Sequence, residues 1–333
     1  MSELFRPYAD VITNMNQCYV SKTPFLFAIN YSKTLGIFTT NSPFGLNAKI
    51  KAEINHNHNV NTFTAHSNLD VKLVFQKEFL SFQTYQSKFE RVVDHLKLGN
   101  SYLLNLTLKT PIAINLSLEQ IFHLSISRYK LLVPGQFVLF SPERFVRIEN
   151  GMISTNPMKG TTDTDIDRDG SGLLMSKKEN AEHNTVVDLL RNDLSIVAEG
   201  VRLRRLKYIE KIKTRFGSLW QMSSEIEGHL RKEFLQQPGF IFDKLLPAGS
   251  ICGAPKKMTC QIIDDVEGYD RGFYTGVFGY FDGNSIDSAV MIRFIGIDPD
   301  GSQYYCAGGG ITAQSILEDE YTEYKNKIYV PIF

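Results

Sequence analysis

The chain has 333 residues, its 36 lysines and arginines balance 36 aspartates and glutamates, and 43% of its residues are apolar. At roughly 150 residues per domain, this composition predicts a soluble globular protein with two domains or one large sheet-based domain. Zero net charge argues against nucleic-acid binding, and no apolar run approaches the ~18 residues of a membrane-spanning helix, so we expect neither nucleic acid nor a membrane as a partner.

The N-terminal residues and the cysteines favour a cytoplasmic location. Residues 1–20 lack the basic start and the apolar stretch of a signal peptide. The four cysteines form no C-x-x-C pair, and this spacing favours reduced thiols.

Residues 1–75 predict short strands joined by polar turns, because side chains alternate with period two around Phe25 and Phe27. His56 and His58 follow in an Asn-rich stretch. They could hold a metal, although such a stretch is more typical of a solvated loop.

Farther along the chain, helical and strand-like patterns are interspersed without a regular alternation. We expect helices at 79–98, 177–190 and 315–329, and strands at 101–110, 136–158, 284–297 and 303–307. This order favours an α+β fold over a doubly wound sheet. No linker divides the chain, so we expect one compact unit in which residues 1–78 form a short β-rich part beside a core of residues 79–333.

Residues 201–215 carry seven basic side chains. The pattern is most typical of a strand pair with a solvated basic face. A docking surface for a partner protein is the alternative, and nucleic acid is a weaker one because the whole chain is neutral.

Two pairs of glutamates have the spacing of a single helix face. Glu179 and Glu182 are three residues apart, and Glu320 and Glu323 repeat this spacing, with Lys327 one turn beyond. Two such faces meeting across a cleft would form an oxygen-rich site suited to Mg²⁺. Acidic pairs are also common on solvated surfaces, so the spacing alone leaves both interpretations open.

Three glycines, Gly308, Gly309 and Gly310, stand between a strand and the last expected helix. Their backbone N–H groups could bind an anion, or the glycines could form a tight turn. Arg293 lies in an apolar strand, where its guanidinium could hold a carboxylate or simply occupy an exposed position.

Lys159 lies between Pro157 and Gly160, which restrict the backbone on both sides. A lysine attacks carbon only as the neutral amine, so it needs burial or cationic neighbours. Glu143 could be a general acid if burial favoured its protonated form. Neither residue, taken alone, differs from an ordinary side chain.

Taken in order, these segments resemble the chorismate-utilising enzyme family over residues 80–333. The matching stretches are SPERFVRI (141–148), NPMKGT (156–161), AEHNTVVDLLRND (181–193), GSICGAPK (249–256), YTGVFGYFDG (274–283), AVMIRF (289–294), AGGGIT (307–312) and DEYTEYKNK (319–327). Each motif is weak alone, but the complete series in this order and spacing is not expected by chance.

The resemblance implies an α+β fold of the anthranilate synthase type, with two large antiparallel sheets packed face to face, helices outside and one active site between the sheets. It implies that Glu182 and Glu323 bind Mg²⁺, with Glu179 and Glu320 beside them. The substrate-binding residues that it implies are Arg293, Gly308, Gly309, Gly310, Lys327, Tyr274 and Thr161.

Within the family, Lys159 resembles one branch. Anthranilate synthases tend to have Ala at this position, whereas the large subunits of aminodeoxychorismate synthases have lysine. In that branch the Lys159 amine attacks C2 of chorismate and expels the 4-hydroxyl, with Glu143 as proton donor. Ammonia then attacks C4 and releases the lysine. The product, 4-amino-4-deoxychorismate, leads to 4-aminobenzoate and folate.

The resemblance also implies a separate glutaminase subunit that supplies the ammonia. No cysteine of this chain stands in a Gly-x-Cys-x-Gly motif, so the glutaminase would be another protein. The basic segment 201–215 is a candidate docking surface for it.

Some positions depart from the family pattern. Cys252 stands where relatives usually have Thr, Leu103 replaces a Gln, and Gln221 replaces a His that is common in anthranilate synthases. The last change argues against an aromatising elimination, and the missing tryptophan-feedback motif predicts no inhibition by tryptophan. The alternatives are anthranilate, isochorismate or salicylate formation on the same scaffold, or a non-catalytic relative that binds chorismate or the glutaminase.

Overall fold

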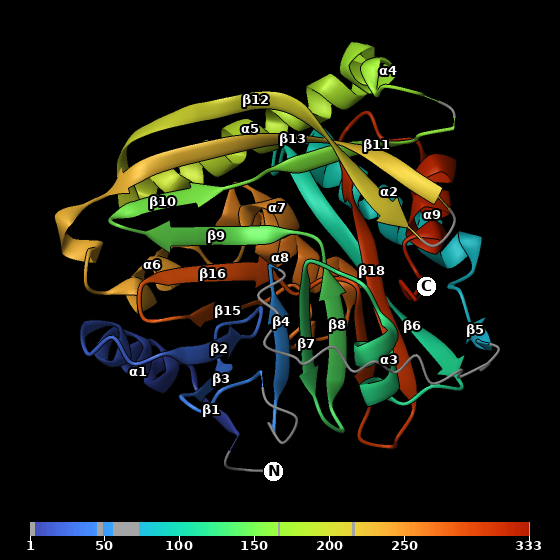
Figure 1. Cartoon of the computed structure of the whole chain (residues 1–333). Helices are drawn as coiled ribbons and strands as arrows, with labels where there is room; N and C mark the ends of the chain where they lie inside the picture. Colours follow the sequence, from blue (N-terminus) through green and yellow to red (C-terminus); the bar gives the residue numbers. More distant parts are fainter. Residues whose placement is uncertain (1–3, 45–48, 56–72, 166, 215–216, 333) are drawn as a thin grey trace.

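The computed structural model describes residues 4–44, 49–55, 73–165, 167–214 and 217–332. Two antiparallel sheets pack against each other, and in Figure 1 the strands of one sheet cross those of the other. The expected α+β fold with two large sheets in a single domain is therefore confirmed.

The larger sheet has ten strands. Their order is β1 (Phe5–Pro7), β3 (Leu35–Thr39), β2 (Phe25–Ile29), β15 (Val277–Phe281), β16 (Ser285–Val290), β9 (Arg144–Glu149), β10 (Met152–Thr155), β13 (Gly217–Leu230) and β11 (Met158–Asp163), and β12 (Ala198–Thr214) pairs with β13. The smaller sheet has eight strands. Their order is β14 (Gly253–Ala254), β6 (Leu103–Ile114), β18 (Gln303–Ile311), β17 (Phe294–Ile297), β8 (Phe137–Ser141), β7 (Tyr129–Val133) and β4 (Lys51–Ile54), and β5 (Phe75–Lys77) pairs with β6.

Helices cover the outer faces of the sheets. They are α1 (Tyr8–Val20), α2 (Phe82–Lys97), α3 (Leu118–Leu124), α4 (Ser171–Met175), α5 (Lys177–Val197), α6 (Pro238–Leu245), α7 (Gly249–Cys252), α8 (Lys256–Glu267) and α9 (Leu317–Asn326), with a 3₁₀ turn at Lys232–Phe234. Helices α2, α8 and α9 pack on the smaller sheet, and α5 packs on β11 and β13. Within the described ranges, no helix combines the length and apolarity needed to cross a membrane.

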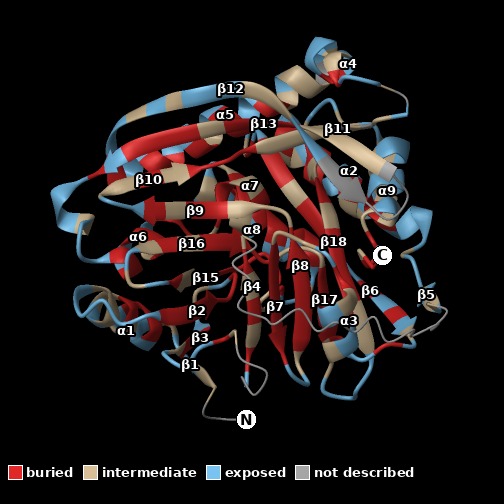
Figure 2. Cartoon of the chain, viewed as in Figure 1, coloured by how far each residue is buried: buried red, intermediate tan, exposed pale blue. Residues whose placement is uncertain are grey.

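Strand β6 separates two apolar clusters. Leu104, Leu106 and Leu108 belong to the cluster beneath α2, α8 and α9, whereas Leu103 belongs to the cluster around Phe145 of the larger sheet. Because side chains alternate along a strand, the odd-numbered residues at this end of β6 face the space between the sheets. Figure 2 shows that the central strands are mostly buried.

The N-terminal part differs from the sequence prediction. Strands are present, but residues Tyr8–Val20 form helix α1, whose Val11, Ile12 and Met15 are buried. The spacing of these three residues fits one helix face, but the intervening polar residues obscured it. His56 and His58, considered above as metal ligands, lie outside the described residues.

The described part of the basic segment lies in strand β12, as predicted, and its arginines face solvent. Arg202 lies 2.7 Å from Glu227, and Arg204 lies 3.1 Å from Glu225, with the arginine side chains 71% and 61% exposed. Ion pairs so exposed contribute little to stability. The solvated basic face is therefore confirmed.

Candidate active site

The three glycines continue strand β18 next to helix α9 and do not form a tight turn. A methyl group on Gly309 would lie 3.2 Å from Glu320 Oε2 and 3.5 Å from Glu323 Oε1. Lys327 donates a hydrogen bond to the carbonyl of Gly308 at 2.8 Å and pairs with Glu323 at 2.5 Å. The structure thus brings the glycines together with two predicted metal ligands and a predicted substrate-binding lysine.

Lys159 reaches the same strand from the larger sheet. It lies where the register of β11 against β13 shifts between Met158 and Thr161. Its Nζ is 4.0 Å from Glu182 Oε2 on α5, and a methyl group on Gly310 would lie 3.6 Å from this Nζ. Lys159 therefore lies between α5 and the end of β18.

Gly160 brings helix α5 close to β11. Its φ is +81°, and a methyl group there would lie 2.7 Å from Glu179 Oε2. Both the left-handed backbone and the close approach require glycine. The i,i+3 spacing predicted that Glu179 and Glu182 share a face of one helix, and both lie on α5 next to the Lys159 segment.

The carboxylates from the two helices influence one another. Burial raises the pKa of Glu320, and the negative charges of Glu323 and Glu182 raise it further, while Ser315 donates a hydrogen bond to its Oε1 at 2.7 Å. A divalent cation would relieve this repulsion. Among the described residues, no three His, Cys, Asp or Glu side chains gather closely enough to hold a metal ion by themselves. The donor set fits Mg²⁺, which completes its coordination with water and substrate oxygens. The metal roles stay predictions.

Glu143 lies close to Ser250 and to three positively charged side chains of the site. Ser250, on α7, donates a hydrogen bond to its Oε1 at 2.6 Å. Burial raises the pKa of Glu143, against the opposing effects of this bond and of the positive charges on Lys159, Arg293 and Lys327. These charges act on Glu143 because all three side chains belong to the same site.

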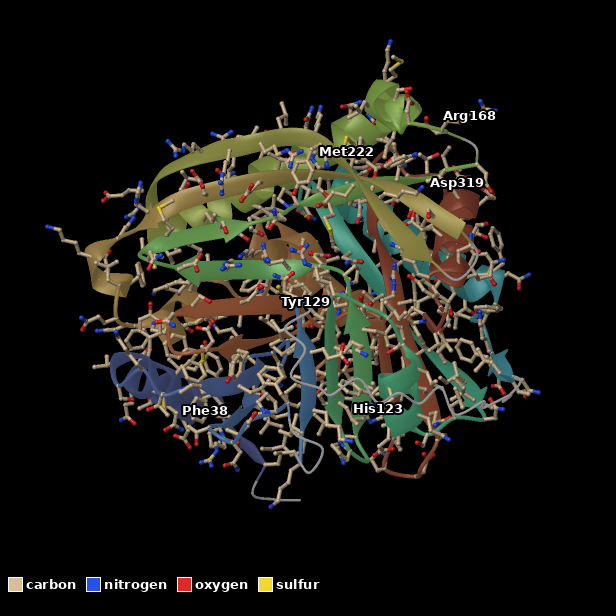
Figure 3. The ribbon with its side chains drawn as sticks, in the orientation of Figure 1. Phe38, His123, Tyr129, Arg168, Met222 and Asp319 are labelled. Carbon is tan, nitrogen blue, oxygen red and sulfur yellow. The ribbon has the colours of Figure 1, made fainter. Side chains whose placement is uncertain are left out.

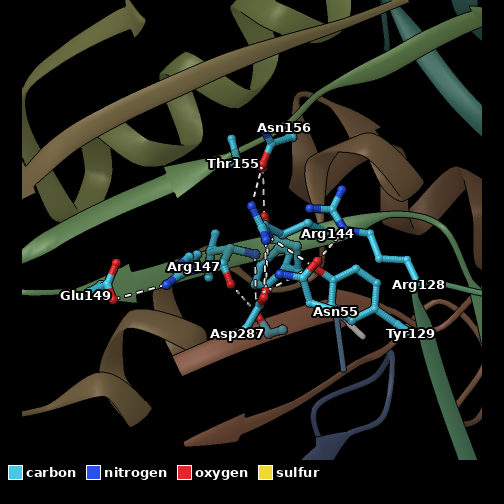
Figure 4. A network of polar contacts seen from close by, with 12 residues as sticks. Asn55, Arg128, Tyr129, Arg144, Arg147, Glu149, Thr155, Asn156 and Asp287 are labelled. Atoms are coloured by element: carbon cyan, nitrogen blue, oxygen red, sulfur yellow. Dashed lines mark hydrogen bonds and ion pairs between the residues drawn. The ribbon is translucent and has the colours of Figure 1, made fainter. Parts of the chain in front are cut away.

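A buried polar network fixes the segments that carry Glu143 and Lys159 (Figure 4). Arg144 donates hydrogen bonds to Asp287 at 3.0 Å and to Asn156 at 2.9 Å. Tyr129, labelled near the middle of Figure 3, donates from the smaller sheet to Asp287 at 3.0 Å. Because Arg144 follows Glu143 and Asn156 precedes Lys159 by three residues, the network holds both segments relative to the two sheets.

Arg293 supplies a buried donor. Its φ is +54°, and its Nε is buried without a hydrogen-bond partner among the described residues. Its guanidinium lies 5.4 Å from the ring centre of Tyr329. Tyr274 is only 3% exposed, and burial raises its pKa. The Arg293 donor is suited to an anionic ligand, whereas the side chain of Thr161 lies outside the described residues.

The three departures from the family pattern lie near this site. Cys252 ends α7, next to the segment that holds Glu143, and Leu103 borders Gly310. Gln221 is opposite Thr161 in the sheet, with a buried Oε1 that has no partner in the described part of the chain.

Sequence analysis did not single out two polar residues of the site. Ser250 was part of a quoted motif, but its contact with Glu143 depends on how α7 meets β9. Asn105 stands in the apolar segment LLNLTL, where a polar residue signals a special role. Its side-chain Oδ1 is buried without a partner among the described residues.

Proteins of three bacteria are similar to this chain in sequence. A protein of Haemophilus influenzae named "uncharacterized PabA-like protein" is 51% identical over 78% of this chain and 79% of its own length. A Pasteurella multocida protein of the same description is 45% identical over 96% of this chain and 98% of its own length. Aminodeoxychorismate synthase component 1 of Klebsiella aerogenes is 32% identical over 75% of this chain and 57% of its own length.

Comparisons of structure agree on the fold. Anthranilate synthase component I of Streptococcus pneumoniae matches with a TM-score of 0.65 and 26% identity, over 77% of this chain and 58% of its own. The menaquinone-specific isochorismate synthase of Escherichia coli matches with a TM-score of 0.63 and 20% identity, over 76% and 60%. The family model described as chorismate binding enzyme matches residues 19–332. The chain therefore belongs to the chorismate-binding enzyme family.

Proposed function

We propose that this enzyme aminates chorismate at C4 with ammonia and produces 4-amino-4-deoxychorismate. The observation that carries the proposal is the position of Lys159, whose Nζ lies beside Gly310 and Glu182 in the site that also contains Glu143. A primary amine and a carboxyl group with a raised pKa provide a nucleophile and an acid.

The proposed reaction has two displacements. The neutral Lys159 amine forms a bond to C2 of chorismate and releases a proton to solvent. Both ring double bonds shift, C1=C2 to C1=C6 and C5=C6 to C4=C5, and the C4–O bond breaks. Glu143 gives its proton to the departing oxygen, which leaves as water. Ammonia then bonds to C4 and loses a proton, and the Lys159 nitrogen takes up a proton and leaves C2 as both double bonds return. The amino group that comes from ammonia therefore ends on C4, the carbon that the hydroxyl left.

The remaining groups anchor the substrate. Arg293 and Lys327 offer positive charge to its carboxylates next to the glycine strand. Mg²⁺ held by Glu182 and Glu323, with Glu179 and Glu320 beside them, would neutralise and orient the ring carboxylate. Glu143 has to be protonated before the hydroxyl leaves, and its raised pKa keeps it so to higher pH.

The ammonia source that we propose is a separate glutaminase subunit in the cytoplasm, and the product serves 4-aminobenzoate and folate synthesis. The relatives named aminodeoxychorismate synthase component 1 support this assignment, although this chain spans little more than half of their length. The relatives named PabA-like are matched over most of their length.

Mass analysis of the products tests the proposal. The purified chain is incubated with chorismate, Mg²⁺ and excess ammonium at mildly alkaline pH. We expect 4-amino-4-deoxychorismate, which an added lyase converts to 4-aminobenzoate. Anthranilate, isochorismate or salicylate would assign one of the other family reactions, and unchanged chorismate, even with a glutaminase added, would indicate a binding protein.

A further inference from the structure

Asn105 faces the space in which the substrate would lie. It stands on β6 between Leu103 and Thr107, on the side of the strand that faces the larger sheet, whereas Leu104 and Leu106 pack under the helices. Its partner across the sheet is Gly310. Residues directly opposite in an antiparallel pair share a face, so the side chain of Asn105 lies over the same face as the absent side chain of Gly310.

That face is shared with Lys159. A methyl group on Gly310 would lie 3.6 Å from Lys159 Nζ and 3.2 Å from Leu103 Cδ1. Leu103 is two residues from Asn105 and points the same way along the strand. Glycine at position 310 leaves open the space that Leu103, Asn105 and Lys159 surround.

The backbone of Asn105 is held firmly. Arg271 Nη2 donates to its carbonyl oxygen at 2.7 Å, and Arg271 Nη1 donates to the carbonyl of Ile251 at 3.5 Å. Ile251 follows Ser250, whose hydroxyl binds Glu143. The guanidinium of Arg271 thus fixes Asn105 relative to the segment that positions the proposed acid.

The side chain of Asn105 lacks a partner. Its Oδ1 is buried and accepts no hydrogen bond from any residue that the structure describes. A buried acceptor without a partner is unfavourable, and such groups in native proteins call for an explanation. In this position the explanation is a donor on the ligand.

Chorismate offers one such donor. It carries two carboxylates, an ether oxygen and a single hydroxyl at C4, and only the hydroxyl can donate a hydrogen bond. We propose that Asn105 is a specificity-determining residue whose Oδ1 accepts the hydrogen bond of the C4 substituent. The hydroxyl of the substrate and the amine of the product both donate, so the same contact serves before and after substitution. The inference rests on the proposed function for the identity of the substrate.

Binding of two unreactive analogues tests this assignment. The analogues are benzoates with the enolpyruvyl ether at the adjacent position, one with a hydroxyl at C4 and one with hydrogen there. Calorimetric titration of the full chain in Mg²⁺ gives the affinity ratio. We expect the wild type to prefer the hydroxylated analogue by about ten-fold or more, because an unmade hydrogen bond to a buried group costs this much.

Variants attribute the preference to Asn105. Asn105→Leu and Asn105→Ala should bind both analogues with equal affinity, and Asn105→Asp should keep the preference because it keeps an acceptor. Thr110→Val is the matched control, since Thr110 lies on the same strand but contacts Tyr324 on the helix side. Melting curves of the same samples identify any variant that fails to fold. Because Asn105→Leu and Asn105→Ala both remove the acceptor, either one that folds is sufficient for the test.

Two results would overturn the assignment. One is a wild type that binds the analogues equally, and the other is an Asn105→Ala protein that folds and keeps the full preference. Either result leaves the proposed amination intact, because amination is measured separately with chorismate and ammonium. Conversely, a preference that depends on Asn105 in a chain that produces no 4-amino-4-deoxychorismate would refute the proposed reaction alone.

Discussion

Two ion pairs lie beside the β6–β18 strand pair, and their geometry differs. Arg271 contacts Glu267 at 2.6 Å and 2.8 Å, and both side chains are 1% exposed. Lys159 and Glu182 are 4.0 Å apart, and their side chains are 29% and 36% exposed. The first pair is in direct contact and excluded from solvent. The second pair is longer and partly exposed, so a ligand can reach it.

The buried pair completes the framework. Glu267 accepts the backbone N–H of Thr107 at 2.7 Å, and Arg271 donates to the carbonyl of Asn105, so the pair replaces a neighbouring strand along this edge of β6. The loose pair has no such role. The comparison indicates that the tight buried pair along β6 serves stability and the loose pair at the end of β18 serves chemistry, and each substitution below tests that division.

Lys159→Ala should have the largest effect on activity. Without the nucleophile, we expect C4 amination to fall by about three orders of magnitude or more, as for other residues that act as a covalent catalytic unit. The melting temperature should stay unchanged, because the two side chains of the pair with Glu182 are 29% and 36% exposed and 4.0 Å apart. Rates of 4-amino-4-deoxychorismate formation and chorismate titrations measure both. A variant that keeps amination would remove the role given to Lys159.

Arg271→Leu should have the largest effect on stability. It leaves Glu267 buried without its partner, and we expect the free energy of unfolding to fall by about 3–5 kcal/mol. Arg91→Leu is the control, since Arg91 and Asp265 are 48% and 66% exposed and their pair contributes less than about 1 kcal/mol. Urea unfolding compares the two, and equal losses would contradict the division described above.

Gly160→Ala should disturb the reactive side more moderately. The new methyl group would lie 2.7 Å from Glu179 Oε2 in a left-handed backbone. We therefore expect the free energy of unfolding to fall by about 1–3 kcal/mol, and the activity to depend less strongly on Mg²⁺. Gly99→Ala is the matched control, because φ is +77° there and nothing lies within 4 Å. Similar Mg²⁺ titrations for both variants would show that only the backbone strain matters.

Ser250→Ala should produce the smallest change, a shift in pH dependence. In the proposed reaction Glu143 acts as an acid, so activity is present below its pKa and is lost as the pH rises through it. The hydrogen bond from Ser250 lowers this pKa. Its removal should move the alkaline limb of kcat/KM to higher pH. Ser250→Thr should retain the wild-type profile, and a downward shift for Ser250→Ala would contradict the assignment of Glu143.

The sequence predicted the elements with strong periodicity. Helix α2 and the strand character of β6 and β12 were correct, because apolar spacing and glycine punctuation are local signals. Helix α1 was missed, since polar residues surround its three buried side chains. The convergence of Glu182, Glu320 and Glu323 could only be conjectured, because Glu182 and Glu320 are 138 residues apart in the chain and lie on different helices.

The candidate site was proposed where residue type and chemistry agreed. Lys159 and Glu143 became significant only together with the family resemblance, and the structure places them in one site. Ser250 and Asn105 were not predicted, because a hydroxyl or an amide in a motif does not show which way it points. Pairing register and the packing of α7 against β6 supply that information.

The most direct test of the account is the mass of the protein itself. The chain is incubated with chorismate and Mg²⁺ in the absence of ammonia, quenched, and examined intact and as peptides. The account predicts an added mass equal to chorismate less one water, located on the peptide that contains Lys159 and absent from Lys159→Ala. Full amination activity with no modified peptide, and with activity retained in Lys159→Ala, would contradict it.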